Sequence, residues 1–200
     1  HEPSRRQRQM CIRDRSCVSG FSGSNYARIT SANLNAGNPP DITMMGWIKI
    51  TDISDYSYLC SIATGSDGMG IAVHASSSAI GGKAYFYDNQ QSSLVHEKGV
   101  NDGEWHHICG VRECSGNRKI IYVDGVRGSN IHYPSNADYS DLDTIAVGHW
   151  CETNGTNPNY HCKGSLALVK IGLTGLTDEQ VKKIYEDEKK LFQPNAKAFL

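Results

Sequence analysis

Short apolar segments alternate with turns along most of the chain. Around Trp47 and Lys49, apolar and polar positions alternate, which is typical of a strand with one buried face and one wet face. Asn, Asp, Gly, Pro and Ser separate such segments, and Asp124-Gly125 is a hairpin signal. The pattern predicts strands over residues 25–30, 42–50, 56–63, 70–74, 84–87, 93–96, 105–111, 119–123, 144–148 and 165–173.

These strands and turns together predict an all-β domain over residues 16–176. Their number and spacing favour a two-sheet antiparallel sandwich of the jelly-roll type. We expect Trp47 and Trp105, with the strands around Ile121 and Val169, to close the core between the two sheets.

The pattern changes near the end of the chain, where residues 177–193 predict one amphipathic C-terminal helix. Thr177 and Gln180 form a capping box at its start, and Pro194 ends it. Residues 194–200 are interpreted as the start of a truncated linker or of a further domain. The apolar face of the helix is predicted to carry Val181, Ile184, Leu191 and Phe192.

Length and charge narrow the class of protein. The chain has 200 residues and a formal net charge of -1, which fits one globular domain. Nucleic acid is an unsuitable main partner because phosphate binding needs an excess of cationic groups. No apolar run approaches the ~18–20 residues that span a bilayer, so the sequence predicts no membrane insertion.

The first residues, 1–15, are set apart from the fold. Back-translated, the Arg-rich segment 5–15 resembles an adapter used in preparing sequencing libraries, which implies a metagenomic source and a non-native segment. The alternative is a genuine basic tail that binds anions weakly.

Five segments then carry a family resemblance. These are Trp47-Ile48-Lys49, the Asp-Gly-Glu-Trp-His-His-Ile of 102–108, the Ile-Tyr-Val-Asp-Gly of 121–125, the Ile-Ala-Val-Gly of 145–148 and the Gly-Ser-Leu-Ala-Leu-Val-Lys-Ile of 164–171. In order and spacing they resemble the laminin-G-like, concanavalin A-like lectin and glucanase jelly-roll family, over residues of about 20 to 192. One departure is Leu166-Ala167-Leu168, where the family usually has an Asp-Glu pair after a glycine.

The resemblance implies a recognition module. We expect a non-enzymatic carbohydrate-binding or adhesion function, with glycans or a host surface receptor as partners. Residues 183–196 also resemble a junction in marine phage tail and structural proteins, which implies a larger protein on a virion or in an extracellular setting. The first alternative is a structural or protein-interaction spacer that packs against neighbouring domains or subunits.

Catalysis is the second alternative, as a glycoside hydrolase relative. Retaining glycosidases need two carboxylates about 5–5.5 Å apart. In the glucanases that share this fold, the carboxylates come from a Glu-x-Asp-x-x-Glu strand, and this sequence contains no such run. The sequence therefore predicts no enzyme activity.

Aromatic and amide side chains gather in or beside the long polar loops of residues 129–163. Such rings can stack on sugar C–H groups while amides bind hydroxyls, and loops often carry binding functions. Ordinary packing at the edge of the sandwich is the alternative. The candidate carbohydrate-binding residues are Trp150, Tyr133, Tyr139, Tyr160, Asn154 and Asn157.

Metal binding and cysteine pairing stay open. Calcium is common in the family, and loop aspartates are candidate ligands, although Asp also serves in turns. Around residues 149–162, zinc binding, a Cys151–Cys162 disulfide and free thiols are alternatives. His106 and His107 should point to opposite faces of a strand and pack rather than share a metal. The candidate calcium ligands are Asp67, Asp88, Asp141 and Asp143.

Overall fold

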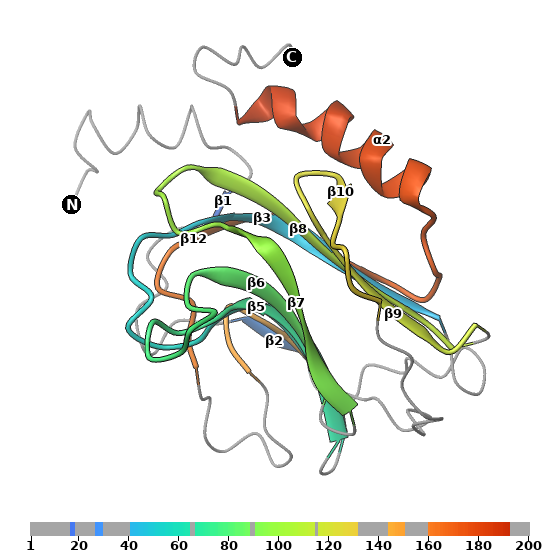
Figure 1. Ribbon diagram of the computed structural model, residues 1–200, viewed down its shortest axis with the longest axis horizontal. Coiled ribbons are helices and arrows are strands. Elements are labelled where there is room, and N and C mark those ends of the chain that lie inside the picture. The colour runs from blue at the N-terminus through green and yellow to red at the C-terminus, as the bar shows by residue number, and fades with distance from the viewer. Residues whose placement is uncertain are drawn as a thin grey trace.

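Two antiparallel β-sheets packed face to face form the body of the domain, with one helix outside them (Figure 1). This arrangement confirms the predicted antiparallel sandwich and C-terminal helix. The computed structural model describes residues 17–18, 27–29, 41–64, 67–88, 91–114, 116–131, 144–150 and 160–192.

Each sheet has six strands among the described residues. In order across the sheet, sheet A consists of β1 (Cys17–Val18), β12 (Ser165–Gly172), β3 (Ile42–Lys49), β8 (Trp105–Glu113), β9 (Arg118–Val123) and β10 (Val126–Arg127). Sheet B consists of β2 (Ala27–Ile29), β11 (Thr144–Val147), β4 (Ser57–Thr64), β5 (Asp67–Val73), β6 (Lys83–Asp88) and β7 (Gln91–Gly99).

Every predicted strand is present, and the differences are two short strands that were not predicted and the start of β5. The pattern misses β1 and β10 because two residues are too few to show a period of two. Strand β5 begins at Asp67, inside a segment predicted as a turn, because Asp67 and Gly68 pair with Thr64 and Ala63 of β4.

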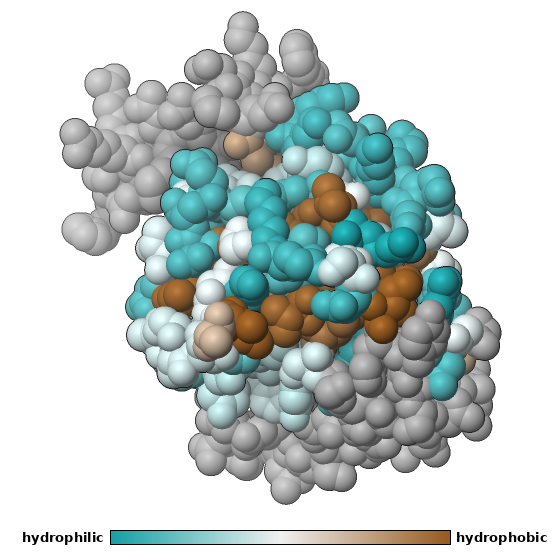
Figure 2. Space-filling view, viewed as in Figure 1, coloured by the Kyte–Doolittle hydropathy of each residue, from teal (hydrophilic) through white to brown (hydrophobic). Residues whose placement is uncertain are grey.

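The main hydrophobic core lies between the two sheets. Alternate residues of β3, such as Ile42 and Ile48, point into it and are fully buried. Gly110 on β8 allows the sheets to approach, since an added Cβ would lie 2.7 Å from Ile71 Cγ2. Seen in the same orientation, Figure 2 shows a band of hydrophobic side chains at the level between the sheets. This burial is the main source of stability.

Helix α2 (Asp178–Glu188) covers the other face of sheet A (Figure 1). The odd-numbered residues of β3 and β8 point toward it, so Trp47 and Trp105 lie on the helix side and not between the sheets. The expectation that these tryptophans close the core between the sheets is therefore wrong. The expected wet face of β3 is also wrong, because only Lys49 of that strand is exposed.

Trp47 is the centre of the contact between the sheet and the helix. Its ring stacks on Tyr185, with centroids 5.7 Å apart, and on Phe192, with centroids 4.2 Å apart. Its Nε1 donates a hydrogen bond to Glu188 Oε2 at 2.8 Å. The apolar ring thus packs the end of the helix against sheet A, and the hydrogen bond from its N–H group holds Glu188 in place.

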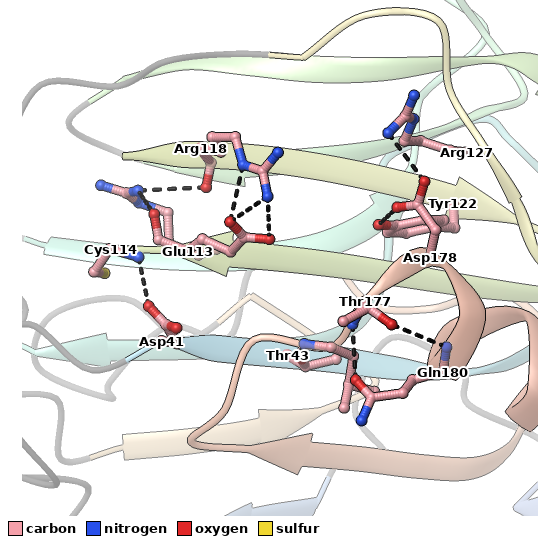
Figure 3. Close-up of polar contacts among 12 residues, drawn as sticks. Asp41, Thr43, Glu113, Cys114, Arg118, Tyr122, Arg127, Thr177, Asp178 and Gln180 are labelled. Atoms are coloured by element: carbon pink, nitrogen blue, oxygen red, sulfur yellow. Dashed lines mark hydrogen bonds and ion pairs between the residues drawn. The ribbon is translucent and has the colours of Figure 1, made fainter. Parts of the chain in front are cut away.

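The predicted capping box at the start of the helix is confirmed (Figure 3). Thr177 Oγ1 accepts from the backbone N–H of Gln180 at 3.3 Å, and Gln180 Oε1 accepts from the N–H of Thr177 at 2.9 Å. Asp178 accepts from the Tyr122 hydroxyl at 2.8 Å and pairs with Arg127 at 3.0 Å, which ties the first turn to β9 and β10.

The end of the helix differs from the prediction. The α-helix stops at Glu188, and a 3₁₀ turn, η1 (Lys189–Leu191), follows. Val181 is buried against sheet A as predicted, but Leu191 is 51% exposed. The tighter 3₁₀ turn rotates Leu191 away from the face that an α-helix would give it. Among the described residues, no helix has the length and apolar character needed to cross a membrane.

Candidate functional site

Aromatic side chains gather on the face of sheet B that points away from sheet A. On β4 and β6, Tyr58 and Tyr85 alternate with Leu59 and Phe86, which point into the core between the sheets. We call this cluster the tyrosine face. It consists of Tyr56, Tyr58, Tyr85, Tyr87, Trp150 and Tyr160.

Small residues on β5 make room for these rings. Gly68, Gly70 and Ala72 lie two residues apart on the strand between β4 and β6. A Cβ at Gly70 would lie 2.9 Å from Cε1 of Tyr58, and one at Gly68 would lie 3.1 Å from Cη2 of Trp150. The rings therefore lie directly on the backbone of β5, and larger residues there would lift them off.

The inner rings of the tyrosine face form a packed layer. Trp150 contacts Tyr58 and Tyr87, with centroid distances of 5.1 Å and 5.2 Å. The Tyr85 hydroxyl donates to the Tyr58 hydroxyl at 2.8 Å. Burial raises the pKa of both phenols far above their usual value, so both stay neutral. The layer is thus rigid and uncharged.

Tyr160 forms the exposed part of the cluster. Its side chain is 42% exposed, and its ring meets Tyr56 edge-on with centroids 5.2 Å apart. Its backbone has φ of +56°, a left-handed conformation that is unusual for a bulky residue. Such strain costs about 1–3 kcal/mol and is found most often at functional sites. The ring contacts with Tyr56 and Tyr58 hold Tyr160 in this conformation against that cost.

Two of the six predicted carbohydrate-binding residues lie among the described residues. Trp150 and Tyr160 both contact Tyr58, but Trp150 is only 8% exposed and lies in the floor of the cluster, so Tyr160 presents the accessible ring. The other four candidates lie outside the described residues: Tyr133, Tyr139, Asn154 and Asn157.

Sequence reasoning missed four members of the tyrosine face. Tyr56 and Tyr58 are two residues apart, as are Tyr85 and Tyr87. A period of two on neighbouring strands places both pairs on one face, so the signal was present in the sequence. The pattern does not by itself mark a binding site, because aromatic residues are common in strands of every kind.

Two of the four candidate calcium ligands lie among the described residues, and calcium binding stays a prediction. Asp88 is buried inside the sandwich, 1% exposed, where its charge acts on Lys119. Burial lowers the pKa of Lys119 to about 8, and Asp88 opposes that effect. Asp67 lies on β5 opposite Thr64. Asp141 and Asp143 lie outside the described residues, and within the described part of the chain no three candidate ligands form a metal site.

The second cluster considered for metal or disulfide chemistry is only partly described. His149 and His161 come together, with ring centroids 5.9 Å apart. Cys162 is fully buried in the core between the sheets, where burial raises the pKa of its thiol to about 12. Cys151 lies outside the described residues, so its disulfide with Cys162 stays a prediction.

The two adjacent histidines of β8 point to opposite faces of sheet A, as predicted, and both are buried. His106 bridges two carboxylates, at 2.8 Å from Asp124 and 3.0 Å from Asp102, and the hydrogen bond with Asp124 raises its pKa. His107 lies beside Trp47, and neither of its ring nitrogens has a hydrogen-bond partner. Burial lowers the pKa of His107 to about 4.

Comparison with known proteins gives the family and the fold. A family model described as the concanavalin A-like lectin/glucanases superfamily matches residues 21–182. No curated protein matches the chain.

Solved structures agree with the jelly-roll prediction. A SAP-like pentraxin from Limulus polyphemus has a TM-score of 0.64 at 18% identity, covering 86% of this chain and 82% of that one. A CBM40 module of a Ruminococcus gnavus sialidase, bound to α2,6-sialyllactose, has a TM-score of 0.66 at 11% identity, with 85% and 96% covered. Mouse laminin α1 domains LG4-5 give 0.59 at 12%, with 82% and 44% covered. The predicted jelly-roll fold is confirmed.

Proposed function

Since the chain belongs to the concanavalin A-like lectin/glucanases superfamily, we propose that it is a non-enzymatic, lectin-like module that binds glycans on the tyrosine face. The observation that carries the proposal is Tyr160, an exposed ring in a strained backbone conformation above a packed aromatic layer. Tyr56 and Tyr87, both half-buried, extend the accessible aromatic surface beside it.

The geometry suits a sugar because it is already organised before binding. Tyr160 is held edge-on by Tyr56 and lies over Tyr58, so little side-chain freedom remains to be lost. Binding sites for small ligands are mostly apolar and aromatic with a few polar groups. The Ruminococcus gnavus module, described as bound to sialyllactose, supports the idea that a sandwich of this shape can carry a glycan site.

A glycan array with the whole chain tests this proposal. We expect binding to at least one oligosaccharide, and we expect Tyr160→Ala to reduce the affinity at least about tenfold because it removes the exposed ring. Val126→Ala is the matched control, since Val126 is another exposed apolar side chain, on β10 of the other sheet. Its binding should equal that of the wild type.

Three results would contradict the proposal in different ways. No signal on the array, with and without calcium, would favour the structural spacer. Unchanged binding by Tyr160→Ala would place the glycan site elsewhere. Turnover of β-glucan by the purified chain would make the protein a glycoside hydrolase relative.

We further propose that the module works in an extracellular setting, as part of a larger phage tail protein. The support is the resemblance of residues 183–196 to a junction found in such proteins. The uninterrupted gene tests this: neighbouring phage structural domains are expected, and a cellular housekeeping gene in their place would overturn it.

A further inference from the structure

We infer that His74 is a specificity-determining residue of the tyrosine face, and that its Nε2 accepts a hydrogen bond from one hydroxyl group of a bound glycan. This inference rests on the proposed glycan binding and adds a polar contact to the aromatic surface. It follows from the place of His74 directly after β5, from its contacts with two tyrosine rings and from the hydrogen bond of its Nδ1.

His74 continues the row of small residues that lies under the tyrosine rings. Gly68, Gly70 and Ala72 occupy every second position on β5. His74 comes two residues after Ala72, and its backbone still pairs with β6, because its N–H donates to the carbonyl oxygen of Lys83 at 2.9 Å. The strand period of two therefore places the side chain of His74 on the same outer face of sheet B. It is the first large side chain in this row.

The imidazole ring of His74 packs against two rings of the aromatic layer. Its centroid lies 4.6 Å from that of Tyr56 and 5.2 Å from that of Tyr85. Tyr56 in turn contacts the exposed ring of Tyr160, with centroids 5.2 Å apart. His74 and Tyr56 are both half-buried, so each is held by its neighbours and still reachable. An oligosaccharide that extends from Tyr160 over Tyr56 therefore meets a polar ring at His74.

The hydrogen bond of Nδ1 decides which nitrogen of His74 can serve a ligand. Nδ1 lies 3.3 Å from the carbonyl oxygen of Ala75, and a carbonyl oxygen can only accept, so Nδ1 carries the proton. In the neutral ring, Nε2 then has a lone pair that can accept. Among the described residues, none forms a hydrogen bond to Nε2, which leaves this lone pair for a ligand. Sites for small ligands combine apolar rings with a few polar groups that set orientation and specificity.

Derivatives of a glycan that binds on the array test this contact with the whole chain. Calorimetry at about pH 8, where histidine side chains are mostly neutral, compares the parent oligosaccharide with derivatives that each lack one hydroxyl group. We expect one derivative to bind the wild type about fivefold more weakly, because one hydrogen bond is lost. His74→Phe keeps an aromatic ring without an acceptor, so it should bind the parent about fivefold more weakly and lose nothing further with that derivative.

Nitrogen-15 NMR of the wild-type chain gives a second measurement that does not depend on the folding of a variant. The resonance of His74 Nε2 should shift when the parent glycan is added, because its lone pair becomes a hydrogen-bond acceptor. The derivative that lacks the contacted hydroxyl group should shift it less. Val126→Ala, on the other sheet, is the control, and its affinities for the parent and for every derivative should equal those of the wild type.

The outcomes separate the inference from the proposal on which it rests. If His74→Phe binds the parent as tightly as the wild type, or loses affinity with each derivative as the wild type does, the role of His74 is overturned and glycan binding is left in place. An Nε2 resonance that stays fixed when the glycan binds overturns it as well. Binding of no glycan at all overturns both.

Discussion

The two outer faces of the sandwich both carry aromatic side chains, and they are used differently. On sheet A, helix α2 covers the rings, and Trp47 is only 2% exposed. On sheet B, no helix among the described residues lies over the tyrosine face, and Tyr160 stays 42% exposed. Both faces are rich in aromatic residues, so aromatic content does not decide the role of a face. A face that a helix covers stabilises the fold, and a face without such a cover remains accessible.

The polar groups on the two faces follow the same division. Trp47 donates its hydrogen bond to Glu188 of the covering helix, so its polar atom joins two layers of the protein. The hydroxyls of Tyr58 and Tyr85 bond to each other within one face. The hydrogen bond of Trp47 therefore docks the helix on sheet A, whereas the hydrogen bond between Tyr58 and Tyr85 holds two rings in place within one layer.

The largest change in stability is expected from a substitution on the covered face of sheet A. Trp47→Ala removes the stacking on Tyr185 and Phe192 and leaves Glu188 without its donor. We expect the free energy of unfolding to fall by about 3–5 kcal/mol, measured by urea denaturation. Leu191→Ala, at an exposed position in the 3₁₀ turn that follows the helix, should change it by less than about 0.5 kcal/mol. An equally small effect of Trp47→Ala would show that helix docking contributes little.

The next prediction concerns pH and the same covered face. His107 is buried without hydrogen bonds to its ring, and its pKa is lowered to about 4 from an ordinary 6.5. The fold therefore favours the neutral ring. The neutral His107 ring makes its full contribution to the free energy of unfolding above pH 6.5. That contribution is lost as the pH falls from 6.5 toward 4, and the loss is about 3 kcal/mol. We expect urea denaturation of His107→Leu at several pH values to show a smaller loss of stability between pH 6.5 and 4 than the wild type shows.

Other titratable groups near His107 stay in the variant, so the comparison isolates the effect of the His107 ring. Glu188 and Asp124 raise the pKa of His107 and Lys170 lowers it, and all three remain in the His107→Leu variant. His106 has the opposite sign, because its raised pKa gives stability that is complete below pH 6.5 and is lost as the pH rises through the folded value. Parallel acid slopes for the wild type and His107→Leu would contradict the prediction.

The smallest effect on stability is expected on the open face. Tyr160→Gly removes ring contacts with Tyr56 and Tyr58 but relieves the left-handed backbone at φ of +56°. The two effects offset each other, so the free energy of unfolding should change by less than about 1 kcal/mol while glycan binding is lost. A loss of several kcal/mol would show that Tyr160 belongs to the structural core, and the contrast between the faces would disappear.

Particular residues show how far prediction from the sequence reached at the site. Trp150 and Tyr160 were both proposed as candidate residues because they lie beside one long polar loop, and in the structure both rings contact Tyr58. The strained backbone of Tyr160 was not predictable, because residue type alone gives no sign of a left-handed conformation at a tyrosine. Nor was the burial of Asp88 predictable, because it depends on its interaction with Lys119 of β9.

The alternation of apolar residues, the turn signals and the capping box determined the two-sheet sandwich and its final helix, because these are local patterns with periods that suit one kind of element. They could not determine which face of each sheet would be covered. Trp47 and Tyr58 both alternate with buried neighbours, and nothing in their strands distinguishes them. Only the docking of α2 on sheet A, through contacts more than a hundred residues apart in sequence, made one face structural and left the other open.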